Sequence, residues 1–228
     1  MTGLREGHIS VRLRGTAGQS LGAFATQGLQ LEVIGDANDY VGKGLSGGTI
    51  IVRPSAAASF VAHDNTIIGN TVLYGATSGK LFAAGQAGER LCVRNSGATA
   101  VVEGSGTNAC EYMTGGRVVI LGEIGDNFGA GMTGGMAFLY DPDGTATDRI
   151  NPASLEVLRL RSAFWETELK TLVEAHAAAT DSALALRLLN QWAVERNNFL
   201  QVVPTEIIPL LEMPLDDSNE VASGSQSA

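Results

Sequence analysis

The amino-acid sequence predicts an all-β protein, a parallel β-helix in which a single chain winds through stacked coils. The first observation is a recurring phrase of glycine and small residues that leads directly into an apolar stretch. The phrase is complete at residues 44–48, 113–116 and 131–135. The second observation is the spacing, because the related glycines Gly79, Gly97, Gly116 and Gly135 recur at a nearly constant interval. A turn and a strand that recur at a fixed period indicate a solenoid of stacked repeats.

The length of the repeat explains its composition. A coil of this length can hold about three short strands joined by tight bends. Glycine at a bend supplies a positive φ, or it lets neighbouring coils approach without a clash at Cβ. If the pattern runs from residue 9 to residue 141, the solenoid contains about seven coils.

The individual strands follow from local patterns. Residues 8–13 and 29–34 alternate apolar and other side chains, which is typical of a strand with one buried face. Residues 54–65 interrupt the period and are expected to loop out from one coil. The turn at residues 141–144, with the sequence Asp-Pro-Asp-Gly, closes the β region. No glycine occurs from residue 145 to residue 222, so the architecture is expected to change there.

The C-terminal part predicts a pair of helices and a short strand. Residues 163–178 have apolar side chains at helical spacing, and Glu166 and Lys170 are placed to form an i,i+4 ion pair. A second helix is expected to begin at Asp181, as its N-cap, and to run through Trp192. Residues 199–204 then form a short extended segment. The pair is expected to cap or flank the solenoid, with capping of its exposed last coil as the default role.

Three segments follow from this division. Residues 1–148 form the glycine-rich parallel β-helix and residues 149–205 form the C-terminal helical segment. Residues 206–228 are expected to be a disordered tail, because the end of the chain is polar and poor in hydrophobic residues.

Composition argues against several classes of function. The net charge is −9, and lysine and arginine do not cluster, which argues against nucleic-acid binding. No stretch approaches the ~20 apolar residues of a membrane span, and no apolar segment of a signal peptide follows Met1. We therefore expect a soluble, cytoplasmic protein. Cys92 and Cys110, the two cysteines, follow no metal or redox pattern and are expected to be buried thiols.

Two glycine motifs imitate nucleotide-binding sites. Residues 42–47 and 129–134 each match G-x-G-x-x-G, but a dinucleotide fingerprint opens a helix, and both copies lead into strand-like runs. The pairs Gly42-Lys43 and Gly79-Lys80 lack the Ser or Thr that follows the lysine of a phosphate loop. All of these are predicted to be bends of the solenoid.

The titratable residues give no clear active site. His8, His63 and His176 are scattered without the spacing of a metal site. A pair of carboxylates facing one cleft could support acid/base chemistry, as in β-helical enzymes that cleave polysaccharides. The candidates near the bends are Asp36, Asp39, Glu103, Glu111, Glu123 and Asp126. Acidic residues at bends more often bond their own backbone. We therefore predict no catalytic, cofactor-binding or metal-ligating residue in this chain.

Several long phrases resemble, in order, the glycine-rich (GXGXG) C-terminal β-helix domain of the large (alpha) subunit of glutamate synthase. They lie at residues 15–24, 35–44, 69–79, 87–90, 93–97 and 110–116. The resemblance extends over about residues 7–204. It implies a right-handed β-helix within a flavin and iron–sulfur enzyme that makes glutamate from glutamine and 2-oxoglutarate.

The resemblance also implies the partners and the role. In this family an amidotransferase domain releases ammonia from glutamine, and an FMN/iron–sulfur barrel uses it, whereas the β-helix supplies no known catalytic side chain. This sequence has no N-terminal cysteine nucleophile, no barrel and no cysteine cluster. It is therefore expected to be a non-catalytic domain or subunit of a hetero-complex, with FMN and the iron–sulfur cluster in the partner.

Two alternatives remain open from the sequence. Related β-helix subunits occur in N-methylglutamate-synthase-like complexes and in formylmethanofuran dehydrogenase. A stand-alone β-helical carbohydrate-active or binding protein is the other alternative, and it predicts a groove lined with aromatic and charged residues. Aromatic residues make up only 6% of the chain and are scattered, which counts against that function.

Overall fold

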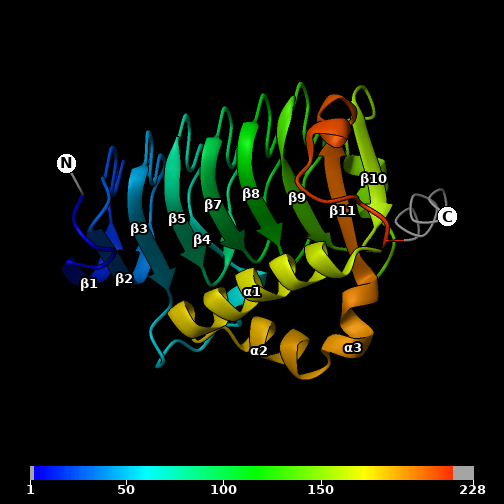
Figure 1. Ribbon diagram of the computed structural model, residues 1–228. Coiled ribbons are helices and arrows are strands. Elements are labelled where there is room, and N and C mark those ends of the chain that lie inside the picture. Colours follow the sequence, from blue (N-terminus) through cyan, green and yellow to red (C-terminus); the bar gives the residue numbers. More distant parts are fainter. Residues whose placement is uncertain (1–2, 218–228) are drawn as a thin grey trace, which may run out of the picture.

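The computed structural model describes residues 3–217 and has the architecture of a parallel β-helix flanked by helices (Figure 1). Seven long strands pair in parallel, each with the strand of the next coil. They are β1 (Ile9–Ala17), β2 (Leu29–Ala37), β3 (Ser46–Arg53), β5 (Ser78–Ala83), β7 (Ser96–Val102), β8 (Thr114–Ile120) and β9 (Gly134–Tyr140). Two shorter strands, β4 (Thr66–Ile68) and β6 (Gln86–Ala87), pair with each other on another side of the coils. The predicted fold class is confirmed.

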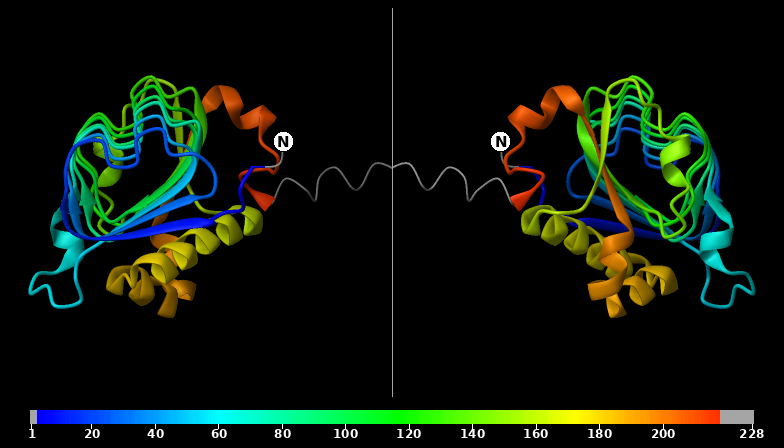
Figure 2. Two further views of the ribbon diagram at one scale, coloured as in Figure 1. Left: turned by 90° about the vertical axis from the view of Figure 1, so that its left-hand side faces the viewer. Right: turned by 90° about the vertical axis from the view of Figure 1, so that its right-hand side faces the viewer.

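The strand register confirms the period that the glycines indicate. Lys80 pairs with Thr99, Thr99 with Arg117 and Arg117 with Met136, so these strands repeat at the same nearly constant interval as the glycines. The interval from Thr49 to its partner Lys80 is clearly longer. The additional length corresponds to residues 54–65, which contain the short 3-10 helix η1 (Ala62–Asp64) and project from the solenoid in Figure 2. The predicted loop is therefore present.

The long strands carry apolar side chains on both faces of the sheet. On the inner face, Leu81, Ala100, Val118 and Ala137 occupy equivalent positions in successive coils and are fully buried. The equivalent outer positions are Ile51, Phe82, Val101, Val119 and Phe138, which are also buried. Burial on both faces explains why these strands are nearly continuous apolar runs rather than alternating ones.

Helix α1 (Ala163–Thr180) covers the outer face. It lies across β3, β5, β7 and β8 and buries Trp165, Leu169 and Val173 against the outer positions (Figure 1). Helices α2 (Ala183–Asn190) and α3 (Trp192–Glu195) follow it. The default expectation of an end cap is therefore wrong, because the apolar outer face of these strands requires cover along the flank.

Strands close the C-terminal end of the sheet. β11 (Phe199–Pro204) pairs antiparallel with β9, and β10 (Leu155–Arg159) pairs antiparallel with β11. The 3-10 helix η2 (Ala146–Arg149) lies between β9 and β10 in the chain. The segment predicted as helical, residues 149–205, thus also supplies two strands to the same sheet.

Local details of the helices differ from the sequence patterns. Asp181 is the left-handed C-cap of α1, with φ of 57°, rather than the N-cap of α2. Ser182 caps α2 instead, and its Oγ accepts a hydrogen bond of 3.0 Å from the Ala185 N–H. Lys170 pairs with Glu174, and Glu166 pairs with Arg196, so the predicted Glu166–Lys170 pair is wrong. Only the Glu166–Arg196 pair depends on tertiary folding, whereas the Ser182 cap and the Lys170–Glu174 pair are local contacts.

The beginning of the predicted tail is folded. After the 3-10 helix η4 (Thr205–Leu210), the chain passes beside α1, where the Trp165 indole N–H donates to the Pro214 carbonyl at 3.1 Å. The Ala163 N–H donates to Asp217 Oδ2 at 2.8 Å. The expectation of disorder therefore does not describe residues 206–217, and residues 218–228 lie outside the described residues. Within residues 3–217, no helix is both long and apolar enough to span a bilayer.

Candidate functional site

The glycine motifs lie in a stack of unusual turns opposite the sheet. In each of six coils, a five-residue turn has positive φ at its first, third and fifth residues. The turns are Ser20/Gly22/Phe24, Tyr40/Gly42/Gly44, Thr71/Leu73/Gly75, Arg90/Cys92/Arg94, Asn108/Cys110/Tyr112 and Asn127/Gly129/Gly131. Both copies of G-x-G-x-x-G begin in this stack and lead into β3 and β9, so neither opens a helix.

The backbone of these turns is committed to contacts between coils. The N–H groups of Tyr40 and Gly44 donate to the carbonyls of Asn70 and Tyr74 in the next coil, at 2.8 and 2.9 Å. The Gly42 N–H points the other way and donates to the Leu21 carbonyl of the preceding coil at 2.8 Å. A phosphate-binding loop instead directs successive N–H groups toward one anion. The geometry of this motif is therefore that of a solenoid bend.

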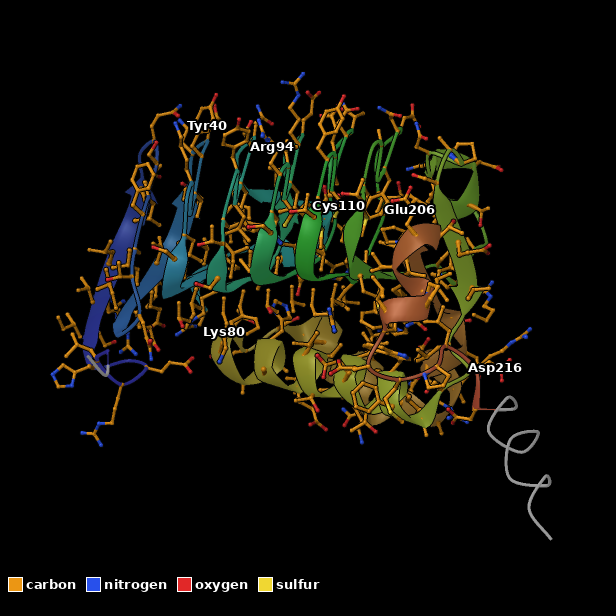
Figure 3. All side chains as sticks on the ribbon, turned by 45° about the horizontal axis from the view of Figure 1, so that its top comes forward. Tyr40, Lys80, Arg94, Cys110, Glu206 and Asp216 are labelled. Atoms are coloured by element: carbon orange, nitrogen blue, oxygen red, sulfur yellow. The ribbon has the colours of Figure 1, made fainter. Side chains whose placement is uncertain are left out.

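Exposed side chains line the outer edge of the turn stack. Phe24 is 65% exposed and Tyr112 is 58% exposed. Each ring lies against a glycine of the next coil, because a Cβ built on Gly44 or Gly131 would be 2.6 Å from the ring carbons. Tyr40 and Arg94 project from the same edge (Figure 3). The neighbouring aromatic ring therefore requires glycine at Gly44 and Gly131, since the equivalent positions of other turns hold Phe24, Arg94 and Tyr112 at similar φ.

The two cysteines occupy equivalent positions in this stack. Cys92 and Cys110 are the third residues of successive turns, and both are free and fully buried. Burial raises the pKa of each thiol far above its ordinary value, and the neighbouring Cys92 adds to the shift at Cys110. Because the thiolate is the reactive form, these positions are suited to packing rather than chemistry.

The six candidate carboxylates do not converge on one site. Asp39 accepts a hydrogen bond from the Asn70 N–H at 2.8 Å, which is the backbone role expected at a bend. Asp36 and Asp126 are exposed. Glu111 lies in the turn stack, far along the coil from Glu103 at the end of β7. Of the six, Glu103 and Glu123 line a common cavity of about 260 Å³, together with Asp141, Arg149 and Arg187.

The clearest polar cluster is buried between the solenoid and the helices. Glu103 accepts a hydrogen bond from the Ser182 hydroxyl, and its Oε1 lies 3.4 Å from His176 Nε2. All three side chains are buried. The serine bonds the carboxylate and not the imidazole, so the cluster does not form the nucleophile–base contact of hydrolases. It joins the end of β7 to α1 and α2.

Sequence reasoning identifies two members of this cluster only as separate candidates. Glu103 and His176 are 73 residues apart in the chain, and nothing in their spacing indicates contact. The sequence pattern misses Ser182, because it favours Asp181 as the N-cap of α2. The detectable signal is a serine directly before the apolar helix. His8 is exposed, and His63 lies beside Asp64 at 3.8 Å in the projecting loop.

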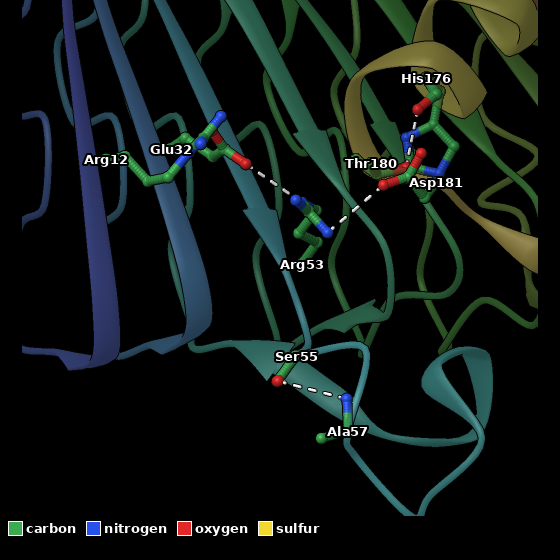
Figure 4. A network of polar contacts seen from close by, with 8 residues as sticks. All are labelled: Arg12, Glu32, Arg53, Ser55, Ala57, His176, Thr180 and Asp181. Carbon is green, nitrogen blue, oxygen red and sulfur yellow. Dashed lines mark hydrogen bonds and ion pairs between the residues drawn. The ribbon is translucent and has the colours of Figure 1, made fainter.

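A second polar network lies on the outer face beyond the C-terminal end of α1. Glu32 Oε2 lies 2.6 Å from Arg12 Nε, and Glu32 Oε1 lies 3.1 Å from Arg53 Nε. Arg53 also forms an ion pair with Asp181, in which Nη1 lies 3.4 Å from Oδ2 (Figure 4). Burial by itself raises the pKa of Glu32, but the hydrogen bonds from Arg12 and Arg53 outweigh it, so the pKa is lowered. At its C-cap, α1 is thus joined to the sheet by an ion pair, whereas its buried apolar side chains pack against the outer face of the strands.

The structure holds no evident metal-binding cluster in the part that it describes. Within residues 3–217, no group of three or more His, Cys, Asp or Glu side chains is placed to hold a metal ion. The cavity beside Glu103 combines carboxylates with two arginines, and Arg187 is already paired with Glu195 at 2.9 Å. The absence of catalytic residues stays a prediction.

Comparisons with known proteins agree with the resemblance in the sequence. The family model described as GXGXG motif matches residues 1–205. The chain is 63% identical over 215 residues, 94% of its length, to the glutamate synthase [NADPH] large chain of Azospirillum brasilense. It is 48% identical over 98% of its length to the ferredoxin-dependent glutamate synthase of Pyropia yezoensis. It is 49% identical over 89% of its length to the glutamate synthase [NADPH] large chain of Bacillus subtilis.

These relatives are much longer than the chain, which spans 14%, 14% and 13% of their respective lengths. The similarity is therefore to one domain-sized part of each glutamate synthase. The solenoid and its stack of positive-φ turns lie within the residues that the family model matches. The chain belongs to the GXGXG motif family.

Proposed function

We propose that this chain is a non-catalytic structural domain or subunit of a glutamate synthase-type oxidoreductase. The enzyme would make glutamate from glutamine and 2-oxoglutarate, and the β-helix would hold its ammonia-producing and ammonia-using parts in register. The observation that carries the proposal is the 63% identity over 94% of the chain to a glutamate synthase large chain of which it spans only 14%.

The use of the polar groups supports a structural role. The turn amides bond neighbouring coils, Asp39 bonds a bend, and Glu103 anchors the helices. The thiols of Cys92 and Cys110 are buried with raised pKa values. Groups that already have structural partners are poorly placed to take part in acid/base or nucleophilic chemistry.

The proposal includes the partners and their setting. A glutamine amidotransferase and an FMN/iron–sulfur synthase part, as further domains or subunits, would supply the catalytic side chains and cofactors. This chain would hold none of the cofactors, and the assembly would be cytoplasmic. The side chains exposed on the turn edge and at the ends of the solenoid are available for contacts with those parts.

The first experiment compares the isolated chain with the complete enzyme that contains it. The isolated chain is expected to be colourless and to form no glutamate from glutamine and 2-oxoglutarate. The complete enzyme should show flavin and iron–sulfur absorption and form glutamate, identified by mass spectrometry. Glutamate formation by the isolated chain would contradict the proposal, and a different amino-acid product would favour a related complex such as an N-methylglutamate synthase.

A set of substitutions in the complete enzyme tests the non-catalytic role directly. Asp36→Asn, Asp39→Asn and Glu111→Gln are expected to change kcat by no more than about twofold, because none would touch a reacting atom. The unfolding midpoint of each variant serves as the control. A loss of kcat of about a hundredfold with an unchanged unfolding midpoint would identify a catalytic carboxylate and overturn the proposal.

A further inference from the structure

The two edges of the long sheet are finished differently. At one edge, β11 pairs with β9 and places Leu200 and Val202 over the solenoid interior, opposite Leu139 and Ala137. At the other edge, β1 pairs with β2, and within residues 3–217 no strand pairs with its free side (Figure 1). The N–H and C=O groups on that side of β1 are therefore available to another strand.

The inward side chains of β1 are also uncovered. Ile9, Val11 and Leu13 are 50%, 37% and 39% exposed. They are in register with Leu29, Leu31 and Val33 of the next coil, and Val33 is fully buried within the solenoid core. The interior of the solenoid is thus open at this edge, with three apolar side chains in a row.

The outward side chains of β1 give this edge a positive charge. Arg12 pairs with Glu32, yet its side chain remains 63% exposed. Arg14 forms no ion pair or side-chain hydrogen bond with any residue from 3 to 217. The chain as a whole carries a net charge of −9, so two arginines on an open strand are a local departure from its overall charge.

We propose that the β1 edge binds an extended segment of a partner polypeptide in which apolar residues alternate with acidic ones. The alternation follows from the pleat, because side chains of an added strand point inward and outward in turn. Inward residues would cover Ile9, Val11 and Leu13, and outward carboxylates would face Arg12 and Arg14. Addition of a strand to an exposed sheet edge is an established mode of peptide recognition.

A second copy of this chain is a poorer occupant. Two-fold pairing of β1 with itself is antiparallel and isologous, so it would bring both pairs of Arg12 and Arg14 onto one outward face. Like charges across paired strands are destabilising. The arginines therefore oppose self-association at this edge while favouring an acidic partner.

This inference rests on the proposed scaffold role, since it assigns one contact surface of that scaffold. Its test does not measure glutamate formation, so the inference and the proposed function can fail separately. The probe is a short fluorescent synthetic peptide that alternates valine and glutamate, and the control peptide has lysine in place of glutamate. The readouts are fluorescence anisotropy and amide hydrogen exchange of the whole chain.

The glutamate peptide is expected to bind saturably, to slow exchange of the β1 amides, and to bind at least about tenfold more tightly than the lysine peptide. The double variant Arg12→Glu/Arg14→Glu should lose that preference. Arg90→Glu/Arg159→Glu makes the same change in net charge at exposed positions away from this edge and should keep it.

Three results would overturn the proposal. One is the absence of binding by the glutamate peptide at millimolar concentration, and another is equal binding of the two peptides. The third is concentration-dependent dimerisation of the unmodified chain with protection of β1, which would make a second copy the occupant.

Discussion

The coils stack by different means on two sides of the solenoid. One side, the sheet wall, consists of the seven long parallel strands from β1 to β9. The other side, the turn wall, is the stack of six positive-φ turns between Ser20 and Gly131. The sheet wall is buried on both faces, so its residues are selected for apolar shape, as in β7, β8 and β9. The turn wall instead requires positive φ at alternate residues of each turn, yet most of these positions hold residues other than glycine. A left-handed residue other than glycine costs about 1–2 kcal/mol. Hydrogen bonds between coils hold such residues in place, for example from the Tyr40 N–H to the Asn70 carbonyl.

The largest expected effect tests the close approach of coils in the sheet wall. Gly116 has φ of 95°, and a Cβ there would lie 2.3 Å from the Ala98 carbonyl oxygen. Gly116→Val combines backbone strain with a clash against main chain and should lower the free energy of unfolding by about 3 kcal/mol or more. Chemical denaturation of the purified chain measures it.

Two glycines separate the contributions of angle and space. Gly75, in the turn wall, has φ of 63° with no atom within 4 Å of an added Cβ, so Gly75→Ala should cost about 1–2 kcal/mol. Gly18 has neither constraint, and Gly18→Ala should be neutral or slightly stabilising. A cost at Gly75 equal to that at Gly116 would contradict the distinction between the walls.

The next effect tests the anchor of the helical cover, which only the sheet wall has. Ser182→Ala removes both the N-cap of α2 and the hydroxyl that donates to buried Glu103. The expected loss is about 2 kcal/mol in the free energy of unfolding. Ser55 accepts a hydrogen bond from the Ala57 N–H in the projecting loop (Figure 4), so Ser55→Ala is the matched control, within about 0.5 kcal/mol of the unmodified chain. If Ser182→Ala and Ser55→Ala lowered the free energy of unfolding by the same amount, Ser182 would have no special role as an anchor.

A smaller effect compares one substitution in both walls. Thr71 is β-branched and has φ of 58°, whereas Asn108 and Asn127 occupy the equivalent first position in other turns. Thr71→Asn should therefore stabilise the chain by about 0.5–1 kcal/mol. Thr99→Asn, in strand β7, should destabilise it by up to about 1 kcal/mol because asparagine is disfavoured in strands. Thermal or urea unfolding would detect the opposite signs, and equal signs would contradict the comparison.

The smallest effect is a pH dependence at the edge of the helical cover. Glu195 accepts hydrogen bonds from the Tyr140 hydroxyl at 2.7 Å and from Asn198, and it pairs with Arg187. The hydrogen bond from Tyr140 is the largest cause that lowers the pKa of this carboxyl. A lowered folded-state pKa stabilises the chain above the unfolded value of about 4.3, and this stabilisation is lost as pH falls through the folded value.

Glu195→Gln should therefore be less stable than the unmodified chain at pH 7, and the difference should shrink below about pH 4. Urea unfolding across this range measures the difference. A gap that stays constant with pH would mean that the ionised form of Glu195 contributes nothing specific.

The sheet wall is more predictable from sequence than the turn wall, for a physical reason. Glycine spacing and apolar runs report strand stacking directly, so the period and the loop at residues 54–65 are evident. Residues such as Cys92, Arg94 and Tyr112 have no intrinsic preference for positive φ, and only their neighbours hold them there. The glycines at residues 42, 44, 129 and 131 indicate two of the turns, but no local pattern indicates those without such glycines.

The helical cover is predictable as helices but not in its placement. An apolar helix face does not specify which apolar surface it packs against, so the sequence leaves both capping and flanking open and favours the end of the solenoid by default. Glu103 and His176 meet only after the chain has folded over the sheet, and Glu166 finds Arg196 rather than its helical neighbour. The buried polar cluster thus depends on tertiary packing.

The long third coil makes the solenoid modular in a practical sense. Strands pair in parallel both before and after the long interval between Thr49 and Lys80, so the additional loop does not disturb the neighbouring coils. Removing the loop would leave a coil of ordinary length, but it would also open the cavity that Phe60, Val61 and Ala62 line together with Glu103 and Ser182. Residues 54–65 are therefore a place where the solenoid can accept a different peptide sequence, provided that the hydrogen bonds from Gln86 to the carbonyls of His63 and Asn65 are kept.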